Sequence, residues 1–576
     1  MQPELRHHPI PRLKEKRRQK GKSVITSRNF TYGDEFIRLY QGDYLSLKVQ
    51  LSTGTSELLV LLNSNLSGEW ADYPFQKTGE QEYSLELQCK QPGAYHAKVK
   101  YSQTQGTTWH FDNIPHSSIM IDPVESKQLR LYTLIPTISG HINHWIEALH
   151  RIKKMGFNAV HLLPVTAMDT SESPYAAADL FDIDQSYAIP DDPRPLLEQF
   201  ESFVKEAKEL GIKLCFDVVL NHVGVTSKIS VNCPDWIASD SNEPDGLKRA
   251  GCWNQMNWVT WQDLVLVKYD HPSKSIRREI WDYMLHYLLF WAKYAHYTGG
   301  MIRLDNLHST NRDFLDFAIS KMRSELPNLT IFAELFTDRQ TTQRMVFFHE
   351  LNLLLATPWT HPYAEQFRQQ LSSIHSVTKV RFLLPVTSHD SGSPAQEYGS
   401  PKAAVSRYAA CALLGGGHTG FVQGAEFGVP QKLSFIGRSP LVEMQATTWG
   451  HDYSEQIRAL NEFLENFELF SQTGNIQFID NNHSAVLAAI RYGKDLKPCF
   501  LVLISFDAQT TQTISISFGG SVLKNRTLLL RNCFSQAQPP SLLDSVYSFT
   551  LDPCEVKVFE IESVIDETKL EQTLRK

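Results

Sequence analysis

The chain has 576 residues, 42% of them hydrophobic and 21% charged, which is an ordinary balance for a globular protein. Its net charge of −7 gives no electrostatic reason to bind nucleic acid or an anionic membrane, so neither is predicted as a partner, and a neutral substrate fits. The scattered cysteines include no Cys-x-x-Cys pair, which argues against a zinc site or a redox motif.

Residues 1–26 are predicted to form a basic, disordered tail. They begin MQPELRHHPIPRLKEKRRQKGK and contain no apolar stretch of the kind that a cleavable secretory signal needs. Scattered cysteines in a long chain are typical of buried thiols in a reducing compartment. The chain is therefore expected in the cytoplasm, although export by a route without a cleavable signal stays open.

Residues 27–126 are predicted to form an N-terminal β-sandwich domain. Short runs in which apolar and polar residues alternate, such as YLSLKVQLS and YHAKVKYS, are separated by Gly, Pro, Ser and Asn. Alternation with a period of two is typical of strands that bury one face, and turn residues between such runs are typical of a sandwich.

Residues 127–468 are predicted to form a parallel (β/α)8 TIM barrel, so the fold class is α/β. Short apolar runs alternate here with amphipathic stretches such as HWIEALHRIKKMG and EQFESFVKEAKELG. A strand–helix repeat of this length favours a parallel core, and eight such units close a barrel. The predicted strands are 129–135, 158–163, 212–219, 300–304, 330–334, 350–355, 381–387 and 418–423.

Two further segments depart from the strand–helix repeat. Residues 223–272, after the third strand, are irregular and rich in Asn, Asp, Trp and Gly, which indicates an insertion. Residues 469–576 return to β patterning, with runs such as CFLVLISF and EVKVFEI, and predict a C-terminal antiparallel β domain.

Polar residues follow four of the predicted barrel strands at the point where each strand ends. The third strand ends in FDVVLNH, the fourth in MIRLDNLHS, the fifth in TIFAELF and the seventh in LLPVTSHD. In this fold the carboxyl ends of the strands form the active-site face, so these side chains should meet in one mouth. The residues concerned are Asp217, Asn221, His222, Arg303, Asp305, His308, Glu334, His389 and Asp390.

This set of side chains suits the cleavage of a glycosidic bond with retention of configuration. That reaction needs two carboxyl groups about 5–5.5 Å apart, one as nucleophile and one as acid/base. Asp305 and Glu334 end neighbouring strands, which lie about 4.8 Å apart. Arg303 leaves its strand on the same side as Asp305 and is expected to hold that carboxyl ionised. Asp390 is a third acid that could stabilise the oxocarbenium-like charge.

The four strand ends resemble the four sequence regions of glycoside hydrolase family 13, the α-amylase family. RLDNLHST, PNLTIFAELFTD and SPYAAADLFDID are more closely similar to the 4-α-glucanotransferase part of glycogen debranching enzyme. The resemblance implies Asp305 as nucleophile, Glu334 as acid/base and Asp390 as transition-state stabiliser. It implies as substrate-binding residues Tyr175, Asp217, His222, Arg303, His308 and His389.

The resemblance implies an α-glucan polysaccharide or oligosaccharide as substrate, cleaved at α-1,4 bonds and transferred to another glucan. Hydrolysis of the α-amylase type is the first alternative, and a non-catalytic glycan-binding or scaffold protein is the remote one. His308 and Ser309 stand where amylases usually carry Lys-His, which puts an ordinary amylase acceptor site in doubt. No second catalytic barrel is predicted, so removal of α-1,6 branches by this chain alone is not expected, and its oligomeric state is left open.

Three smaller features also allow more than one interpretation. The tryptophans of WNQMNWVTWQDLVLVKYD are either sugar platforms or the core of the insertion. Glu426, in the glycine-rich segment of the eighth strand, is expected near the mouth. No metal or other cofactor is predicted, although Asn221 and an insertion aspartate leave a structural calcium open.

Overall fold

The structure is a computed structural model, and it describes residues 25–30, 36–51, 58–111, 117–254, 257–376, 380–438, 441–442, 444–524, 527–534, 541–543 and 546–564. Most of the segment predicted as a basic tail lies outside these residues. The chain divides into two compact units, the first ending at Met120 and the second running from Ile121, with Pro92–Ala94 grouped with the second. The predicted domain boundaries remain predictions.

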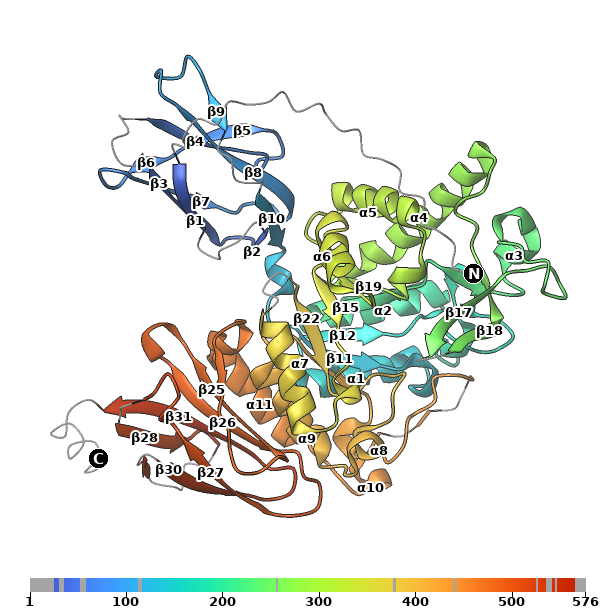
Figure 1. The fold of residues 1–576 in the computed structure, drawn as a ribbon. Helices are drawn as coiled ribbons and strands as arrows, with labels where there is room; N and C mark the ends of the chain where they lie inside the picture. Colours follow the sequence, from blue (N-terminus) through green and yellow to red (C-terminus); the bar gives the residue numbers. More distant parts are fainter. Residues whose placement is uncertain are drawn as a thin grey trace. The chain divides into compact units, whose positions relative to one another are not determined.

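The first unit is built from two sheets (Figure 1). Alternate residues of the central strands, such as Leu45, Leu47 and Val49, are buried between them. One sheet has the order β1 (Ile25–Phe30), β3 (Tyr44–Leu51), β7 (Glu82–Gln88), β6 (Gln76–Lys77). The other has the order β2 (Phe36–Tyr40), β10 (Ser117–Asp122), β8 (Gly93–Ser102), β4 (Leu59–Ser64), β5 (Ala71–Pro74), with β9 (His110–Phe111) on β8.

The second unit contains a closed barrel of eight parallel strands, which confirms the predicted fold class. Each strand falls within one of the eight predicted runs. In barrel order they are β11 (Arg130–Leu134), β12 (Ala159–Leu162), β15 (Lys213–Val218), β19 (Met301–Leu304), β20 (Thr330–Ala333), β21 (Leu353–Leu355), β22 (Phe382–Pro385) and β23 (Thr419–Val422).

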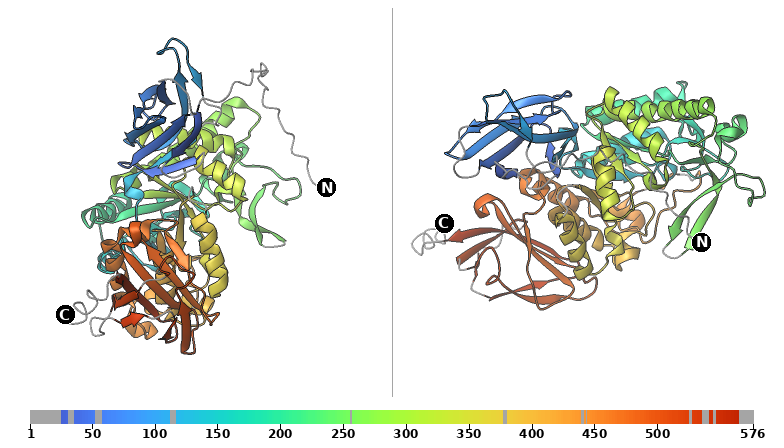
Figure 2. Two further views of the ribbon diagram at one scale, coloured as in Figure 1. Left: turned by 60° about the vertical axis from the view of Figure 1, so that its left-hand side comes forward. Right: turned by 45° about the horizontal axis from the view of Figure 1, so that its top comes forward.

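Helices surround the barrel strands, as the views in Figure 2 show. In α1, Trp145, Leu149 and Ile152 recur at helical spacing and are buried, which fixes the inward face of that helix. Within the described residues, no helix is both long and apolar enough to cross a bilayer. The α-helices are α1 (Ile142–Lys154), α2 (Leu196–Glu209), α3 (Lys228–Asn232), α4 (Lys274–Tyr297), α5 (Arg312–Glu325), α6 (Arg339–Phe348), α7 (Ala364–Ser376), α8 (Pro394–Tyr398), α9 (Ala403–Leu414), α10 (Ala446–Trp449) and α11 (Ser454–Asn466).

The barrel interior is layered, and the layering positions the site. One inward layer is apolar and takes residues from successive strands, among them Cys215 of β15, Met301 of β19 and Phe332 of β20. Because side chains alternate along a strand, the residues two positions further on also face inward. In β15 and β19 these are Asp217 and Arg303, so polar residues form the next layer toward the carboxyl ends.

Small antiparallel sheets lie beside the carboxyl ends of the barrel strands. Within the predicted insertion, β18 (Asn257–Leu266) pairs with β16 (His222–Gly224) and with β17 (Arg249–Asn254). A second hairpin pairs β13 (Thr166–Met168) with β14 (Ala177–Ile183), just beyond β12. The pairing of β16 places His222 opposite Leu266 at the base of the insertion.

The C-terminal part of the second unit consists of antiparallel sheets with their own apolar core, including Leu501, Leu503 and Ile514. Arg407 of α9 lies over the ring of Phe506, 3.6 Å from its centroid, and links this region to the barrel. The larger sheet has the order β24 (Ile476–Phe478), β25 (Val486–Tyr492), β26 (Cys499–Ser505), β31 (Val556–Val564), β28 (Thr527–Asn532), β29 (Ser541–Leu543), and β27 (Gln512–Ser517) pairs with β30 (Val546–Leu551).

Candidate active site

A buried arginine holds three carboxylates together at the carboxyl ends of β15, β19 and β20. Arg303 is fully buried and lies opposite Asp217 in the strand register. Its Nη1 donates to both oxygens of Asp217, at 2.9 and 2.7 Å, and to Asp305 Oδ1 at 2.9 Å. Its Nη2 donates to Glu334 Oε2 at 2.9 Å. One guanidinium therefore fixes the carboxyl groups of Asp305 and Glu334 relative to each other.

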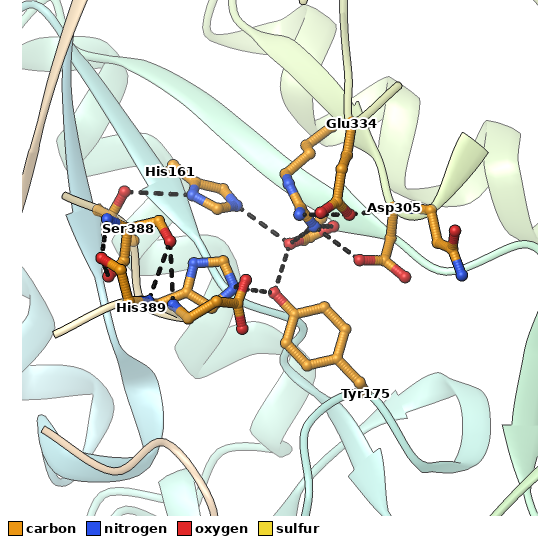
Figure 3. A network of polar contacts seen from close by, with 12 residues as sticks. His161, Tyr175, Asp305, Glu334, Ser388 and His389 are labelled. Carbon is orange, nitrogen blue, oxygen red and sulfur yellow. Dashed lines mark hydrogen bonds and ion pairs between the residues drawn. The ribbon is translucent and has the colours of Figure 1, made fainter. Parts of the chain in front are cut away.

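The carboxyl groups of Asp305 and Glu334 approach each other around this cation and keep an exposed edge (Figure 3). Their side chains are 11% and 18% exposed, whereas that of Asp217 is fully buried. Two carboxyl groups that a ligand can reach thus stand over a third that it cannot. The prediction that neighbouring strands bring residues 305 and 334 together agrees with this geometry.

Backbone hydrogen bonds set the positions of the two exposed acids. The backbone N–H of Asp305 donates to Val218 O at 3.2 Å, which continues the pairing of β19 with β15 beyond the last strand residue. Asn306 adopts a left-handed conformation with φ of 44°, and its N–H donates to Glu334 Oε2 at 3.1 Å. This turn points a main-chain N–H at the Glu334 carboxylate. Few residues other than glycine adopt the left-handed conformation that it requires.

Tyr175 and His389 form a second wall of the site. The Tyr175 hydroxyl donates to Asp217 Oδ2 at 2.9 Å and lies 2.7 Å from His389 Nε2. The two rings are stacked, with centroids 5.7 Å apart and planes inclined by 9° (Figure 3). Tyr175 reaches the cluster from the loop before β14 and bonds Asp217 directly, and His389 reaches Tyr175 from the loop after β22.

The remaining predicted residues lie at the rim or beside the cluster. The Asp390 side chain is 54% exposed and lies 3.1 Å from His389 Nε2 through its Oδ2. His308 is exposed, and its ring lies 6.0 Å from that of Phe336. His222 is buried, with its ring 6.4 Å from that of Trp261. These residues surround the acids without bonding to Arg303.

Two contributors were missed by the sequence reasoning. His161, in β12, lies 3.2 Å from Asp217 Oδ2 through Nε2 (Figure 3). A histidine inside an otherwise apolar strand is unusual, and this is the sequence signal that marks His161. Lys432 lies in the loop after β23, and its ammonium donates to the backbone oxygen of Asp390 at 2.8 Å. No pattern in the sequence marks that loop residue.

Burial and the shared arginine set the pKa values of the acids in opposite directions. Burial raises the pKa of Asp217, but Arg303 and His161 together outweigh burial, so this carboxyl has a pKa well below its usual range. Burial raises the pKa of Asp305 well above its usual range, Arg303 opposes the rise, and Glu334 and Asp217 add to it. Arg303 lowers the pKa of Asp305, the direction expected from the sequence, but burial and the neighbouring carboxylates outweigh this effect.

The histidines of the site do not supply a compensating positive charge. Burial lowers the pKa of His389 well below its usual range, and Arg303 lowers it further. Burial likewise lowers the pKa of His161, although Asp217 opposes that shift. Three carboxyl groups thus share one guanidinium, and this excess of negative charge favours the binding of one proton by the cluster.

Comparisons with known proteins agree with this geometry. Residues 122–250 match the family described as glycogen debranching enzyme, glucanotransferase domain. The chain is 23% identical over 239 residues to the α-1,4-glucan:maltose-1-phosphate maltosyltransferase of Picrophilus torridus, covering 38% of this chain and 35% of that protein. It is also 23% identical over 239 residues to the intracellular maltogenic amylase of Bacillus subtilis, covering 41% and 37%. Over these segments the chain resembles proteins that act on α-glucans.

Solved structures share the fold of this chain. A noncanonic maltogenic α-amylase of Thermotoga neapolitana superposes with a TM-score of 0.59 at 18% identity, covering 77% of this chain and 100% of that one. The Nostoc punctiforme debranching enzyme superposes with a TM-score of 0.56 at 15% identity, covering 76% and 99%. The matched segments span about a third of the length of the curated relatives named above.

Two other sequence expectations, on Glu426 and on the insertion tryptophans, have clear outcomes in the structure. Glu426 is fully buried, accepts a hydrogen bond from the Tyr132 hydroxyl at 2.6 Å and is paired with Arg151, so it is structural and not at the mouth. Trp261 packs into the core of the insertion, whereas Trp258 is 52% exposed. Among the described residues, no group of three or more His, Cys, Asp or Glu side chains is arranged to hold a metal ion.

Proposed function

We propose that this chain is a retaining 4-α-glucanotransferase that cleaves α-1,4-glucosidic bonds of glycogen, starch or maltooligosaccharides and transfers the cleaved segment to another glucan. The observation that carries the proposal is the pair of exposed carboxyl groups, Asp305 and Glu334, held by opposite nitrogens of one buried guanidinium. A close carboxyl pair at the mouth of a barrel is what retaining glycoside chemistry requires.

The two acids take different roles because their surroundings differ. Asp305 lies deeper, beside Asp217, and acts as the nucleophile in its ionised form. Glu334 is the more exposed of the pair and acts as the general acid. Glu334 must carry a proton when the bond breaks, because the general acid donates that proton to the leaving oxygen.

The first half-reaction forms a covalent ester. A carboxylate oxygen of Asp305 attacks the anomeric carbon, the bond from that carbon to the glycosidic oxygen breaks, and the oxygen takes the proton of Glu334. Asp390, at the rim, would stabilise the positive charge that develops on the sugar ring. Tyr175 and His389 would support the same ring from the wall that they form.

The second half-reaction uses the same acids in reverse. Glu334, now ionised, removes the proton from the 4-hydroxyl of an acceptor glucan, whose oxygen attacks the anomeric carbon and displaces Asp305. Two inversions leave the product in the α configuration. If water takes the place of the acceptor, the same site acts as a hydrolase of the α-amylase type, so the acceptor decides between the two reactions.

Incubation of the pure protein with maltotetraose tests the proposal. Transfer produces longer oligosaccharides together with shorter ones, whereas hydrolysis produces only shorter ones. Chromatography of the products distinguishes the two, and NMR of the first products should show the α anomer. Release of the β anomer would refute retention, and an unchanged substrate would refute the function itself.

A further inference from the structure

A cleft of about 850 Å³ lies between α6 and α7 and over the carboxyl end of β21. The two helices that flank it are labelled in Figure 1. Its lining begins with Leu335 and Phe336, the two residues that follow Glu334 in the chain. None of the mechanism described so far uses this cleft, and none of the predicted site residues lines it.

Phe336 connects the cleft with the acid/base side of the active site. Its side chain lines the cleft and is 47% exposed, which is uncommon for a phenylalanine next to a catalytic strand. Its ring lies 6.0 Å from that of His308, and His308 is close enough to Glu334 to feel its charge. A chain leaving the Glu334 side of the active site therefore meets an aromatic surface at the start of the cleft.

The walls of the cleft are polar but almost uncharged. On α7, Gln366, Gln369, Gln370 and Ser373 follow the spacing of one helical face and all line the cleft. A helix face that packs directly against a neighbouring helix normally carries apolar residues at this spacing. Across the cleft, α6 contributes among others Thr342 and Gln343, and the loops on either side add further threonines.

The composition of the lining points to a neutral, hydroxyl-rich ligand. Arg339 is the only Arg, Lys, Asp or Glu among the described residues that line the cleft. The floor is apolar and includes Leu354, Leu355 and Phe382, surfaces that suit the C–H faces of a pyranose ring. Amide and hydroxyl groups around such a floor can both donate and accept hydrogen bonds, as sugar hydroxyls require.

One of the wall amides has spare hydrogen-bonding capacity. The side-chain oxygen of Gln370 is buried and has no hydrogen-bond partner among the residues that the structure describes. A buried acceptor without a partner destabilises the fold. Because this oxygen has no hydrogen bond to lose, accepting one from a ligand hydroxyl would be a net gain. This is the behaviour of a binding group and not of a packing contact.

We propose that this cleft binds the acceptor α-glucan chain. The proposal rests on the proposed function, because the acceptor must approach from the side of Glu334, which removes its proton. A bound acceptor keeps its 4-hydroxyl at the covalent intermediate and excludes water, which favours transfer over hydrolysis. A long acceptor would reach the cleft, whereas a single glucose would occupy only the position next to the acids.

Two neighbouring serines provide a matched pair of variants. Ser373 lines the cleft, whereas Ser372 is exposed on the same helix outside it. Ser373→Trp should fill the cleft, and Ser372→Trp adds the same bulk elsewhere. With maltotetraose as donor, the ratio of transfer to labelled maltoheptaose over transfer to labelled glucose should fall about tenfold in Ser373→Trp, the equivalent of one or two hydrogen bonds. It should stay at the wild-type ratio in Ser372→Trp.

Equal ratios in the two serine variants would overturn the cleft assignment while leaving the proposed function intact. If Ser373→Trp fails to fold, Gln366→Ala combined with Gln370→Ala tests the same wall and should lower the same ratio. Should the wild-type chain transfer to neither acceptor, the proposed function fails. Calorimetry with maltoheptaose then tests separately whether the cleft binds a glucan. Ser373→Trp should weaken maltoheptaose binding, whereas Ser372→Trp should not.

Discussion

The two sides of the barrel mouth differ in the kind of polar residue that they carry. On the side of β15, β19 and β20, Asp217, Asp305 and Glu334 surround a single buried Arg303. On the side of β21, the cleft between α6 and α7 is lined by amides, hydroxyls and apolar side chains, with Arg339 as its one strongly charged residue among the described lining. The first side stores charge away from water, and the second offers neutral hydrogen-bonding groups.

This difference separates bond breaking from chain binding. Buried charges are costly unless paired, so an excess of carboxylates around one cation shifts their pKa values and prepares a proton for transfer. Neutral groups around an apolar floor have little effect on protonation but can hold a polyol. Substitutions on the charged side should therefore change turnover and pH dependence, whereas those on the cleft side should change the choice of acceptor.

The largest effect is expected from removing either exposed acid. Asp305→Asn removes the nucleophile and Glu334→Gln removes the proton donor, so each should lower kcat on maltooligosaccharides by at least about 10³-fold. Activity is measured as release of reducing ends and formation of longer products. Asp316→Asn, on the exposed side of α5, is the charge-matched control and should retain wild-type activity. Near-normal turnover in either acid variant would contradict the assignment.

A smaller loss is expected from changing the cation that organises the charged side. Arg303→Lys keeps the positive charge but cannot bond Asp305 and Glu334 through two fixed nitrogens, so kcat should fall by about 10²-fold. The melting temperature of the variant distinguishes misplacement from unfolding. A loss no larger than twofold in a folded protein would show that the two carboxyl groups are positioned independently of this guanidinium.

The acid limb of the pH–rate profile should report the raised pKa of Asp305. Because the nucleophile must be ionised, kcat/KM should fall as the pH drops through a pKa above that of an ordinary aspartate. Asp217→Asn removes a negative neighbour that raises this pKa, so the acid limb should move to lower pH. The remote variant Asp316→Asn should leave the limb in place, and an upward shift in Asp217→Asn would contradict the electrostatic account.

The smallest effect concerns stability and has the opposite sign to the loss of activity. A carboxyl with a raised pKa in the folded state loses its proton more readily when unfolded, so stability falls as the pH rises between the two pKa values. An asparagine at this position does not ionise, so it avoids this loss of stability at higher pH. Asp305→Asn should therefore melt a few degrees above the wild type at neutral pH, with the difference vanishing below pH 4. A lower melting temperature at neutral pH would contradict this.

The sequence by itself determined the barrel, its eight strands and the strand ends that carry the acids. Alternation of apolar residues has a fixed period in strands and another in helices, so Cys215 and Asp217 could be assigned to one face without knowing their neighbours. Arg303, Asp305 and Glu334 could likewise be predicted to lie close together, because consecutive barrel strands are neighbours in space.

Only the tertiary structure decided which carboxylates bond the same cation and which residues line the same cleft. Arg303 was expected to serve Asp305, yet its nitrogen bonds Asp217 as well, and the sequence contains no information on that division. Glu426 was expected at the mouth but pairs with Arg151 in the interior. The cleft combines residues from α6, β21 and α7. Electrostatic energies depend on distance and burial in three dimensions, and local patterns of residues specify neither.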